Sequence, residues 1–259
     1  DRFGIKPLYY FNNDKYLILS SEIKPILHYE NIDKINIEVA ANFFFKGSMD
    51  HNESTFFSKV SAIKPSSYGL IDQKSFRIKK YWQIVNKNLS YDIQIQKEIP
   101  KLKDLINKSV KKHLLSDFEI GLFLSGGTDS TALAHLISKN TNQNLKTFTY
   151  GFTSQSHLSE ISHAEQTVSN LKIKNYSVNV NENDVISRMD KILNQLESPF
   201  TSIRLFGVMK LYEVAKKKKI KVIIEGDGGD EILGGYDYNY LPHLLDISLI
   251  DSLKMCLVD

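Results

Sequence analysis

The residues with the clearest chemical potential form a hexapeptide, Ser-Gly-Gly-Thr-Asp-Ser, at positions 125–130, which we call the SGGTDS loop. Glycines let a backbone approach a phosphate closely, and the first turn of a helix offers N–H groups without intrahelical partners. Ser125 and Ser130 add hydroxyl groups, and Asp129 offers a hard oxygen ligand for a metal that bridges phosphates. The loop therefore predicts a cradle for a nucleotide pyrophosphate.

The position of the SGGTDS loop in the sequence supports this interpretation. An apolar strand is predicted directly before it, over residues 120–124, and an amphipathic helix is predicted to begin near Thr131. No Gly-Lys-Ser or Gly-Lys-Thr follows at the spacing of a Walker A loop, so that motif is excluded. An ordinary strand–helix turn would explain the glycine pair alone, but not the whole hexapeptide in this context.

A second loop, Glu-Gly-Asp-Gly-Gly-Asp-Glu at positions 225–231, directly follows a strand predicted over residues 220–224. We call it the EGDGGDE loop. Its three glycines and four carboxylates disfavour any regular element. An acidic solvent loop would explain the charges, but not their place at the end of a strand. If this strand lies beside residues 120–124, Asp129 and Asp230 face one cleft, and two carboxylates with phosphate oxygens suit Mg²⁺.

The elements that must position these loops change character along the chain. Residues 1–83 are β-rich, with a hairpin predicted over 8–19, and residues 84–98 are polar and predicted to be a linker. Residues 99–259 alternate amphipathic helices with apolar strands. This pattern predicts the α/β class, with a parallel sheet covered on both faces and ligands bound beyond the carboxyl ends of its strands.

Composition excludes several function classes. The net charge is +3, from 33 Lys and Arg against 30 Asp and Glu, which is too mild to indicate nucleic acid. No apolar run approaches the ~18 residues of a membrane span, so no membrane partner is expected. The single cysteine, Cys256, excludes an internal disulfide and fits a reducing, cytoplasmic compartment.

Four separated motifs together resemble one family. The SGGTDS loop looks like the PP-loop of ATP pyrophosphatases, and with residues 226–236 (GDGGDEILGGY) it resembles the synthetase domain of glutamine-hydrolysing asparagine synthetases. Residues 1–10 and 21–24 resemble the last part of that family's class II, Ntn-type glutaminase domain, and Tyr81-Trp82 resembles the pair before its synthetase domain. The resemblance implies a parallel-sheet PP-loop (adenine nucleotide alpha hydrolase-like) domain over 99–259, preceded over 1–83 by the β-rich end of a glutaminase domain.

The resemblance also implies an activity. Glutamine is hydrolysed to ammonia, ATP with Mg²⁺ adenylates the side-chain carboxylate of aspartate, and ammonia then displaces AMP to give asparagine. Mg²⁺ would be held by Asp129 and Asp230. The partners are small molecules (aspartate, glutamine or ammonia, and ATP), with a homodimer as a possible assembly. The residues implied to contact ATP are Leu124, Ser125, Gly126, Gly127, Asp129, Ser130, Tyr150 and Gly226.

Two positions depart from the family pattern. Asp227 stands where many members have a glutamate proposed to deprotonate ammonia; an aspartate can do this chemistry but reaches one methylene less far. Glu225 replaces a small residue. These departures leave open another carboxylate acceptor, such as a sugar acid or a peptide carboxylate.

Two further alternatives change the class of function. A tRNA-thiolating enzyme would show a Cys-x-x-Cys motif or a basic, aromatic-rich face, and neither is found. A non-catalytic remnant is the last alternative. The family's nucleophilic cysteine and adenylation lysine belong to regions before residue 1 and after residue 259, so the chain is expected to be an inactive fragment by itself.

Overall fold

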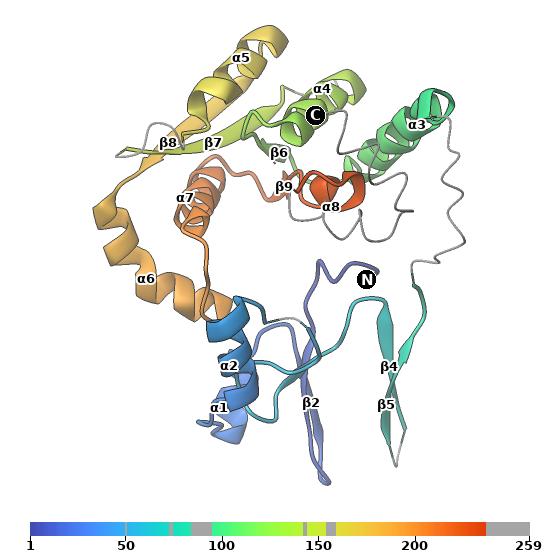
Figure 1. The fold of residues 1–259 in the computed structure, drawn as a ribbon, viewed down its shortest axis with the longest axis vertical. Helices are drawn as coiled ribbons and strands as arrows, with labels where there is room; N and C mark the ends of the chain where they lie inside the picture. Colours follow the sequence, from blue (N-terminus) through green and yellow to red (C-terminus); the bar gives the residue numbers. More distant parts are fainter. Residues whose placement is uncertain (50, 73–74, 84–94, 142–143, 154–158, 237–259) are drawn as a thin grey trace, which may run out of the picture. The chain divides into compact units, whose positions relative to one another are not determined.

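The structure is a computed structural model of residues 1–259, and it describes all of them except 50, 73–74, 84–94, 142–143, 154–158 and 237–259 (Figure 1). It divides into two compact units. Unit 1 contains residues 1–93 and 188–202, and unit 2 contains residues 94–187 and 203–259. Most of the predicted linker and Cys256 lie outside the described residues, whereas residues 95–98 belong to a helix.

Unit 1 contains a small antiparallel sheet, a separate hairpin and two helices. The predicted first hairpin is confirmed, with Tyr9 opposite Ser20, and a two-residue strand that the sequence did not predict pairs on the other side. Phe11, Ile26 and Val60 are in the core of this unit. The elements are β1 (Tyr9–Asn12), β2 (Leu17–Ser20), α1 (Lys24–Glu30), α2 (Ile37–Lys46), β3 (Ser61–Ala62), β4 (Ser67–Ile71) and β5 (Phe76–Lys80).

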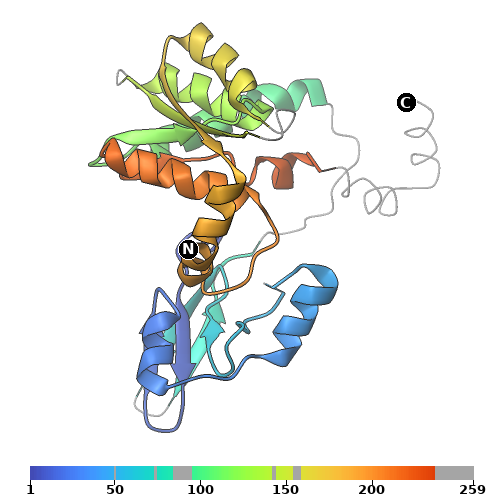
Figure 2. The same ribbon diagram turned by 90° about the vertical axis from the view of Figure 1, so that its left-hand side faces the viewer.

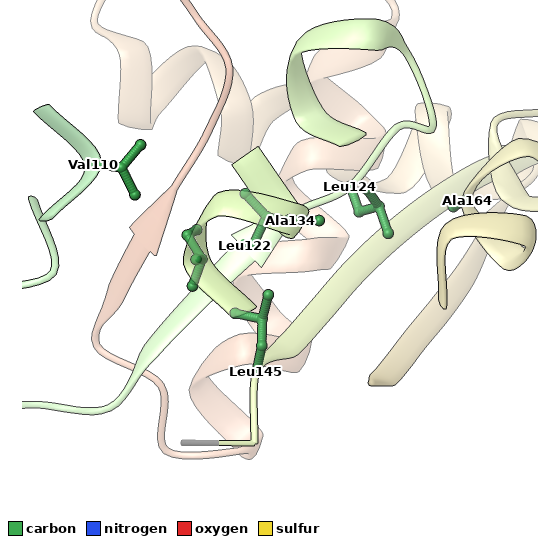
Figure 3. Close-up of a cluster of buried hydrophobic side chains, with 7 residues drawn as sticks. Val110, Leu122, Leu124, Ala134, Leu145 and Ala164 are labelled. Atoms are coloured by element: carbon green, nitrogen blue, oxygen red, sulfur yellow. The ribbon is translucent and has the colours of Figure 1, made fainter. Parts of the chain in front are cut away.

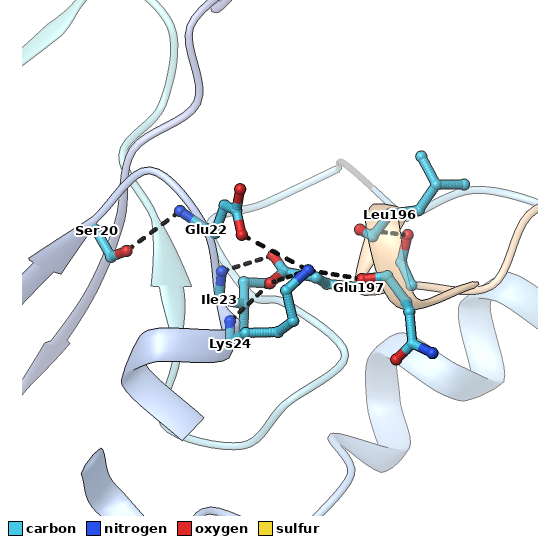
Figure 4. Close-up of polar contacts among 8 residues, drawn as sticks. Ser20, Glu22, Ile23, Lys24, Leu196 and Glu197 are labelled. Carbon is cyan, nitrogen blue, oxygen red and sulfur yellow. Dashed lines mark hydrogen bonds and ion pairs between the residues drawn. The ribbon is translucent and has the colours of Figure 1, made fainter. Parts of the chain in front are cut away.

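A buried carboxylate from a distant part of the chain caps helix α1 (Figure 4). The residue before α1, Ile23, makes no side-chain cap of its own. Glu197, with a side chain only 6% exposed, accepts hydrogen bonds from the backbone N–H groups of Ile23 at 2.6 Å and Lys24 at 2.7 Å. The Lys24 ammonium lies 3.4 Å from Glu197 Oε1 and donates to the carbonyl of Asn194 at 2.7 Å. Residues 188–202 are thereby joined to the start of α1.

We expect Glu197→Ala to destabilise this part of unit 1 by about 1–3 kcal/mol, because it leaves backbone donors without their acceptor. Hydrogen exchange at the Ile23 and Lys24 amides measures the effect. The matched control is Glu22→Ala, which removes an exposed carboxylate 3.6 Å from the same lysine and should cost less than about 0.5 kcal/mol. Unchanged exchange at both amides in the Glu197 variant would contradict the capping role.

Unit 2 is built around a four-stranded, all-parallel sheet in the order β8-β7-β6-β9, which confirms the predicted class. The strands are β6 (Ile120–Phe123), β7 (Lys146–Phe152), β8 (Lys174–Val180) and β9 (Val222–Ile224). The helices are α3 (Ile95–His113), α4 (Thr128–Asn140), α5 (Ile161–Leu171), α6 (Glu182–Leu196), α7 (Arg204–Lys217) and α8 (Gly229–Leu233). Helix α6 begins in unit 2 and continues into unit 1 at Arg188.

Two boundaries differ from the sequence prediction. Helix α4 begins at Thr128 rather than near Thr131, because Gly127 is extended and is the N-cap residue, so half of the SGGTDS loop is helical. The EGDGGDE loop was predicted to be irregular, but its last three residues begin α8. Gly228, with φ of +97°, makes the turn before this helix, and Asp230 lies in its first turn, where a negative charge is favourable.

Helices cover both faces of the sheet (Figure 2). On one face, Leu122 and Leu124 pack with Ala134 of α4 and with residues of α3 and α5, as Figure 3 shows in part. On the other face, Phe148 and Tyr150 pack with α7. Side chains alternate between the faces of a strand, so coverage on both sides explains why β6 and β9 are apolar throughout.

The strand order creates a crevice at one edge of the sheet. Strand β6 pairs with β7 on one side and β9 on the other, so the chain runs outward through β7 and β8 and later returns beside β6. Such a reversal separates the loops that follow the two central strands and leaves room for a ligand. Both loops singled out in the sequence lie there. Within the described ranges, no helix is long and apolar enough to cross a membrane.

Candidate active site

A cavity of about 670 Å³ opens at this edge of the sheet in unit 2, within the usual size range of small-molecule sites. It is lined by both loops, by the middle of β7 and by the first turns of α7. Nine of the ten predicted site residues line it: Leu124, Ser125, Gly127, Asp129, Ser130, Tyr150, Gly226, Asp227 and Asp230. The tenth, Gly126, lies behind the wall and shapes it.

Gly126 sets the path of the SGGTDS loop. Its φ of +83° is in the left-handed region, and a Cβ there would lie 2.5 Å from His163 Cβ and 2.7 Å from the backbone nitrogen of Ala164. Ser125 Oγ accepts from the Gly127 N–H at 3.2 Å and lies 3.0 Å from Ser130 Oγ, which donates to the Gly127 carbonyl at 3.2 Å. The loop is therefore held in shape before any ligand binds.

The SGGTDS loop is also fixed to β7. The Leu124 N–H donates to the Phe148 carbonyl at 2.9 Å, and the Leu124 carbonyl accepts from Thr149 Oγ1 at 2.7 Å. The Leu124 side chain is 1% exposed and belongs to the core. This residue therefore anchors the loop, and the N-terminal turn of α4, with only a glycine as its N-cap, is presented to the cavity.

Glycines allow the two loops to pack against each other. A Cβ on Gly229 would lie 2.0 Å from Asp129 Oδ2, and one on Gly226 would lie 3.3 Å from Asp129 Cβ. A Cβ on Gly235 would likewise lie 2.0 Å from Asp230 Oδ1. The Asp129 carboxylate thus rests on the backbone of the EGDGGDE loop, next to the residue before Asp230.

Two carboxylates at this junction fit a metal that is shared with a substrate. In the part of the chain that the structure describes, no group of three or more His, Cys, Asp or Glu residues could hold a metal by itself. Asp129 and Asp230 nevertheless line the same cavity. Mg²⁺ takes one or two carboxylates and fills its remaining positions with phosphate oxygens and water, so this donor set suits it.

Gly229→Ala should separate folding from function. Gly229 is helical, so alanine raises helix propensity by up to about 1 kcal/mol, but its Cβ needs the space of the Asp129 carboxylate. We expect retained thermal stability together with at least about tenfold weaker Mg²⁺-dependent nucleotide binding, measured by calorimetry on the full-length protein.

The control is Gly228→Ala, at a φ of +97° with nothing within 4 Å of the added carbon. It should lower stability by about 1–2 kcal/mol through backbone strain, and leave Asp129 in place. Nucleotide binding that is equally weak in both variants, or unchanged in both, would contradict the packing argument.

Two more carboxylates, Glu225 and Asp227, line the cavity behind this junction. Glu225 is exposed as a residue, but the cavity wall partly desolvates its carboxyl group. This desolvation, followed by the charge of Asp227, raises the pKa of the Glu225 carboxyl. Desolvation, Glu225 and Asp227 also raise the pKa of the Tyr212 phenol. This wall therefore favours a proton or another positive charge.

The raised pKa of Glu225 has a consequence for stability. Below the pKa of an unfolded glutamate, ~4.3, Glu225 is protonated in both the folded and the unfolded protein, so it does not change the free energy of unfolding. As the pH rises through the higher pKa of the folded protein, Glu225 must ionise in a site that disfavours its charge, and the folded protein loses stability. We expect Glu225→Gln to be more stable than the parent at pH 7, with the difference vanishing in acid, as measured by thermal unfolding across pH.

Glu231→Gln provides a control of opposite sign. Its own backbone N–H and the Tyr236 hydroxyl lower the pKa of the exposed Glu231 carboxyl. Its small stabilising contribution is therefore present at neutral pH and lost in acid. If the Glu225 variant followed the same direction as the Glu231 variant, the proposed desolvation of Glu225 would be wrong.

Three residues form a group that the sequence did not reveal. Arg204 Nε donates to the Tyr150 hydroxyl at 3.0 Å, and Arg204 Nη2 lies 3.3 Å from Glu160 Oε1. Burial raises the pKa values of the Tyr150 phenol and the Glu160 carboxyl, while Arg204 opposes both shifts. Only Tyr150 was predicted. The sequence could have pointed to Arg204 as a site residue, because it is a cation in the first turn of a helix, where the helix dipole disfavours a positive charge.

Comparison with known proteins identifies the family of the chain. A family model described as asparagine synthase matches residues 101–254, more than half of the chain. The chain belongs to the asparagine synthase family. A second model, described as a glutamine amidotransferase domain, matches residues 1–82. The family resemblance found in the sequence is thus confirmed.

The individual relatives of this chain include proteins named as asparagine synthetases and one named as an amidase. Asparagine synthetase [glutamine-hydrolyzing] 1 of Bacillus subtilis is 31% identical over 92% of this chain and 37% of its own length. A putative asparagine synthetase [glutamine-hydrolyzing] 2 of Methanocaldococcus jannaschii is also 31% identical, over 91% of this chain and 46% of its own length. Amidase chyE of Penicillium rubens is 29% identical over 92% of this chain and 37% of its own length. The chain thus spans less than half the length of these curated relatives.

Proposed function

We propose that the chain is part of a glutamine-dependent ligase that adenylates a carboxylate with ATP and then converts it to an amide, with aspartate as acceptor and asparagine as product. The observation that carries the proposal is the single cavity into which both loops open, at the reversal of strand order between β6 and β9. Two family matches support the proposal: residues 1–82 match a glutamine amidotransferase domain, and residues 101–254 match asparagine synthase.

Each part of the cavity has a role in this reaction. The SGGTDS loop would bind the phosphates of ATP through the N–H groups at the start of α4. An oxygen of the acceptor carboxylate attacks the α-phosphorus, and the bond from phosphorus to the leaving pyrophosphate breaks. Ammonia nitrogen then attacks the acyl carbon, the carbon–oxygen bond to AMP breaks, and the nitrogen loses a proton. Asp227, which lines the cavity, is the proposed acceptor of that proton.

Asp129 and Asp230 would hold Mg²⁺, which supplies positive charge for the pyrophosphate as it leaves. Their positions on two adjacent loops match this role, because the ion would then lie between the SGGTDS loop and the EGDGGDE loop. Gly226 and Tyr150 complete the proposed nucleotide contacts.

A second candidate keeps the chemistry and changes the acceptor. The similarity to Amidase chyE and the Glu225–Asp227 pair favour consideration of another carboxylate, such as a sugar acid.

We further propose a cytoplasmic location, the end of a glutaminase domain in residues 1–83, a linker over 84–98, and the start of the ATP-binding domain in residues 99–259.

The test uses the full-length protein with ATP, Mg²⁺, glutamine and aspartate. We expect AMP and pyrophosphate to form in equal amounts with asparagine, and Asp129→Asn to lower kcat/KM by at least about 100-fold, since it removes a charged ligand near the leaving group. Release of AMP and pyrophosphate without any dependence on aspartate would exclude asparagine and favour the second candidate. Release of ADP and phosphate would contradict adenylation altogether.

A further inference from the structure

The last carbonyl before the SGGTDS loop is bound by a side chain instead of by the sheet. The pairing of β6 with β7 ends at Phe123 opposite Phe148, and only the Leu124 N–H continues it, to the Phe148 carbonyl at 2.9 Å. In a longer ladder, a backbone N–H of β7 would donate to the Leu124 carbonyl. Among the described residues no backbone N–H does so, and the donor is the hydroxyl of Thr149, at 2.7 Å.

The hydroxyl of Thr149 has a single proton, and two acceptors lie near it. Its Oγ1 atom is 2.7 Å from the Leu124 carbonyl and 3.2 Å from Asn175 Oδ1 on β8. The Leu124 carbonyl is the nearer acceptor, and a buried carbonyl without a donor is costly. Thr149 is itself only 1% exposed, so packing fixes its position. The hydroxyl therefore holds the Leu124 carbonyl in one direction.

The bond to the Leu124 carbonyl also sets the direction of the next N–H. This carbonyl and the Ser125 N–H belong to one planar, trans peptide unit, in which they point in opposite directions. The Ser125 N–H therefore points away from Thr149. Ser125 lines the cavity, and within the described ranges its N–H donates to no protein group. It is a backbone donor of fixed direction that is available to a ligand.

We propose that Thr149 is a positioning residue, which holds the peptide between Leu124 and Ser125 so that the Ser125 N–H donates to a phosphate oxygen of the nucleotide. This inference rests on the proposed function, because it takes a nucleotide phosphate as the ligand. The N–H groups at the start of α4 are oriented by the helix itself. Ser125 precedes that helix and needs another support, which Thr149 supplies from the neighbouring strand.

Thr147 provides a matched control on the same strand. Its hydroxyl is also buried, donates to the Lys174 carbonyl at 3.3 Å and lies 3.0 Å from the same Asn175 oxygen. Both of these partners are on β8, away from the SGGTDS loop. Removal of either hydroxyl thus leaves a similar gap in the sheet, but only the loss of the Thr149 hydroxyl releases the peptide before the loop.

The test is calorimetric binding of ATP and of pyrophosphate, each with Mg²⁺, to the full-length protein. Thr149→Val should weaken both ligands by at least about tenfold, because a hydrogen bond to a charged group is misaligned or lost. Thr149→Ser keeps the hydroxyl and should bind as the parent does. Thr147→Val should lower the melting temperature by a similar amount to Thr149→Val, but leave both affinities unchanged.

A second measurement reports on Ser125 directly. Pyrophosphate should slow hydrogen exchange at the Ser125 amide in the parent and in Thr149→Ser, because the N–H becomes bonded to the ligand. In Thr149→Val, saturating pyrophosphate should slow this exchange much less.

Other outcomes would overturn the inference. Parent-like affinity in Thr149→Val, or no slowing of Ser125 exchange in the parent, would exclude the positioning role. Equally weak binding in the two valine variants would indicate a general loosening of the sheet, and weak binding in Thr149→Ser would show that the hydroxyl is not responsible. If the parent bound neither ATP nor pyrophosphate, the proposed function would be refuted, and this inference with it.

Discussion

The parallel pairing of β9 with β6 is the constraint on which the site depends. It covers three residue pairs, from Ile120 opposite Val222 to Leu122 opposite Ile224, and yet it brings together loops about a hundred positions apart. Gly121 makes this pairing possible, since a Cβ there would lie 2.7 Å from the Phe148 ring and 2.9 Å from Ile223 Cδ1. The geometry of the cavity therefore depends on packing in the middle of the sheet as well as on the two loops.

The loops themselves combine rigid backbone with unfavourable charge. Gly226 and Gly229 let the backbone meet the Asp129 carboxylate, while Glu225 and Asp227 add negative charge to the same cavity. Desolvation and the nearby Asp227 raise the pKa of the Glu225 carboxyl, so its ionised form is disfavoured in the cavity. Such local cost is characteristic of sites that bind their charge complement from a substrate or an ion, so binding and stability are linked in this unit.

Most of the sheet and both loops could be predicted from the sequence, because apolar strand segments and clustered glycines can be recognised from neighbouring residues alone. The sequence did not predict the start of α4 or the existence of α8, which depend on how Gly127 and Gly228 turn. Arg204 was missed because its partner Tyr150 lies 54 positions away and only the fold brings them together. The sequence predicts amphipathic helices in this part of the chain, but in α6 Ile186 is 77% exposed whereas Ile192 is buried. Hydrophobic periodicity predicts a helical face, but it does not predict which residues another element covers.

The path of α6 has a consequence for how the gene can be divided. The chain begins in unit 1, returns to it at Arg188 and leaves it again after Ser202. This exit is only two positions before Arg204 of the cavity wall. A single cut after residue 93 would therefore separate Glu197 from the helix whose start it caps. Each half would carry a defect created by the cut itself. Exchange of halves with a relative would separate the same partners, so residues 188–202 and the start of α1 must be exchanged together.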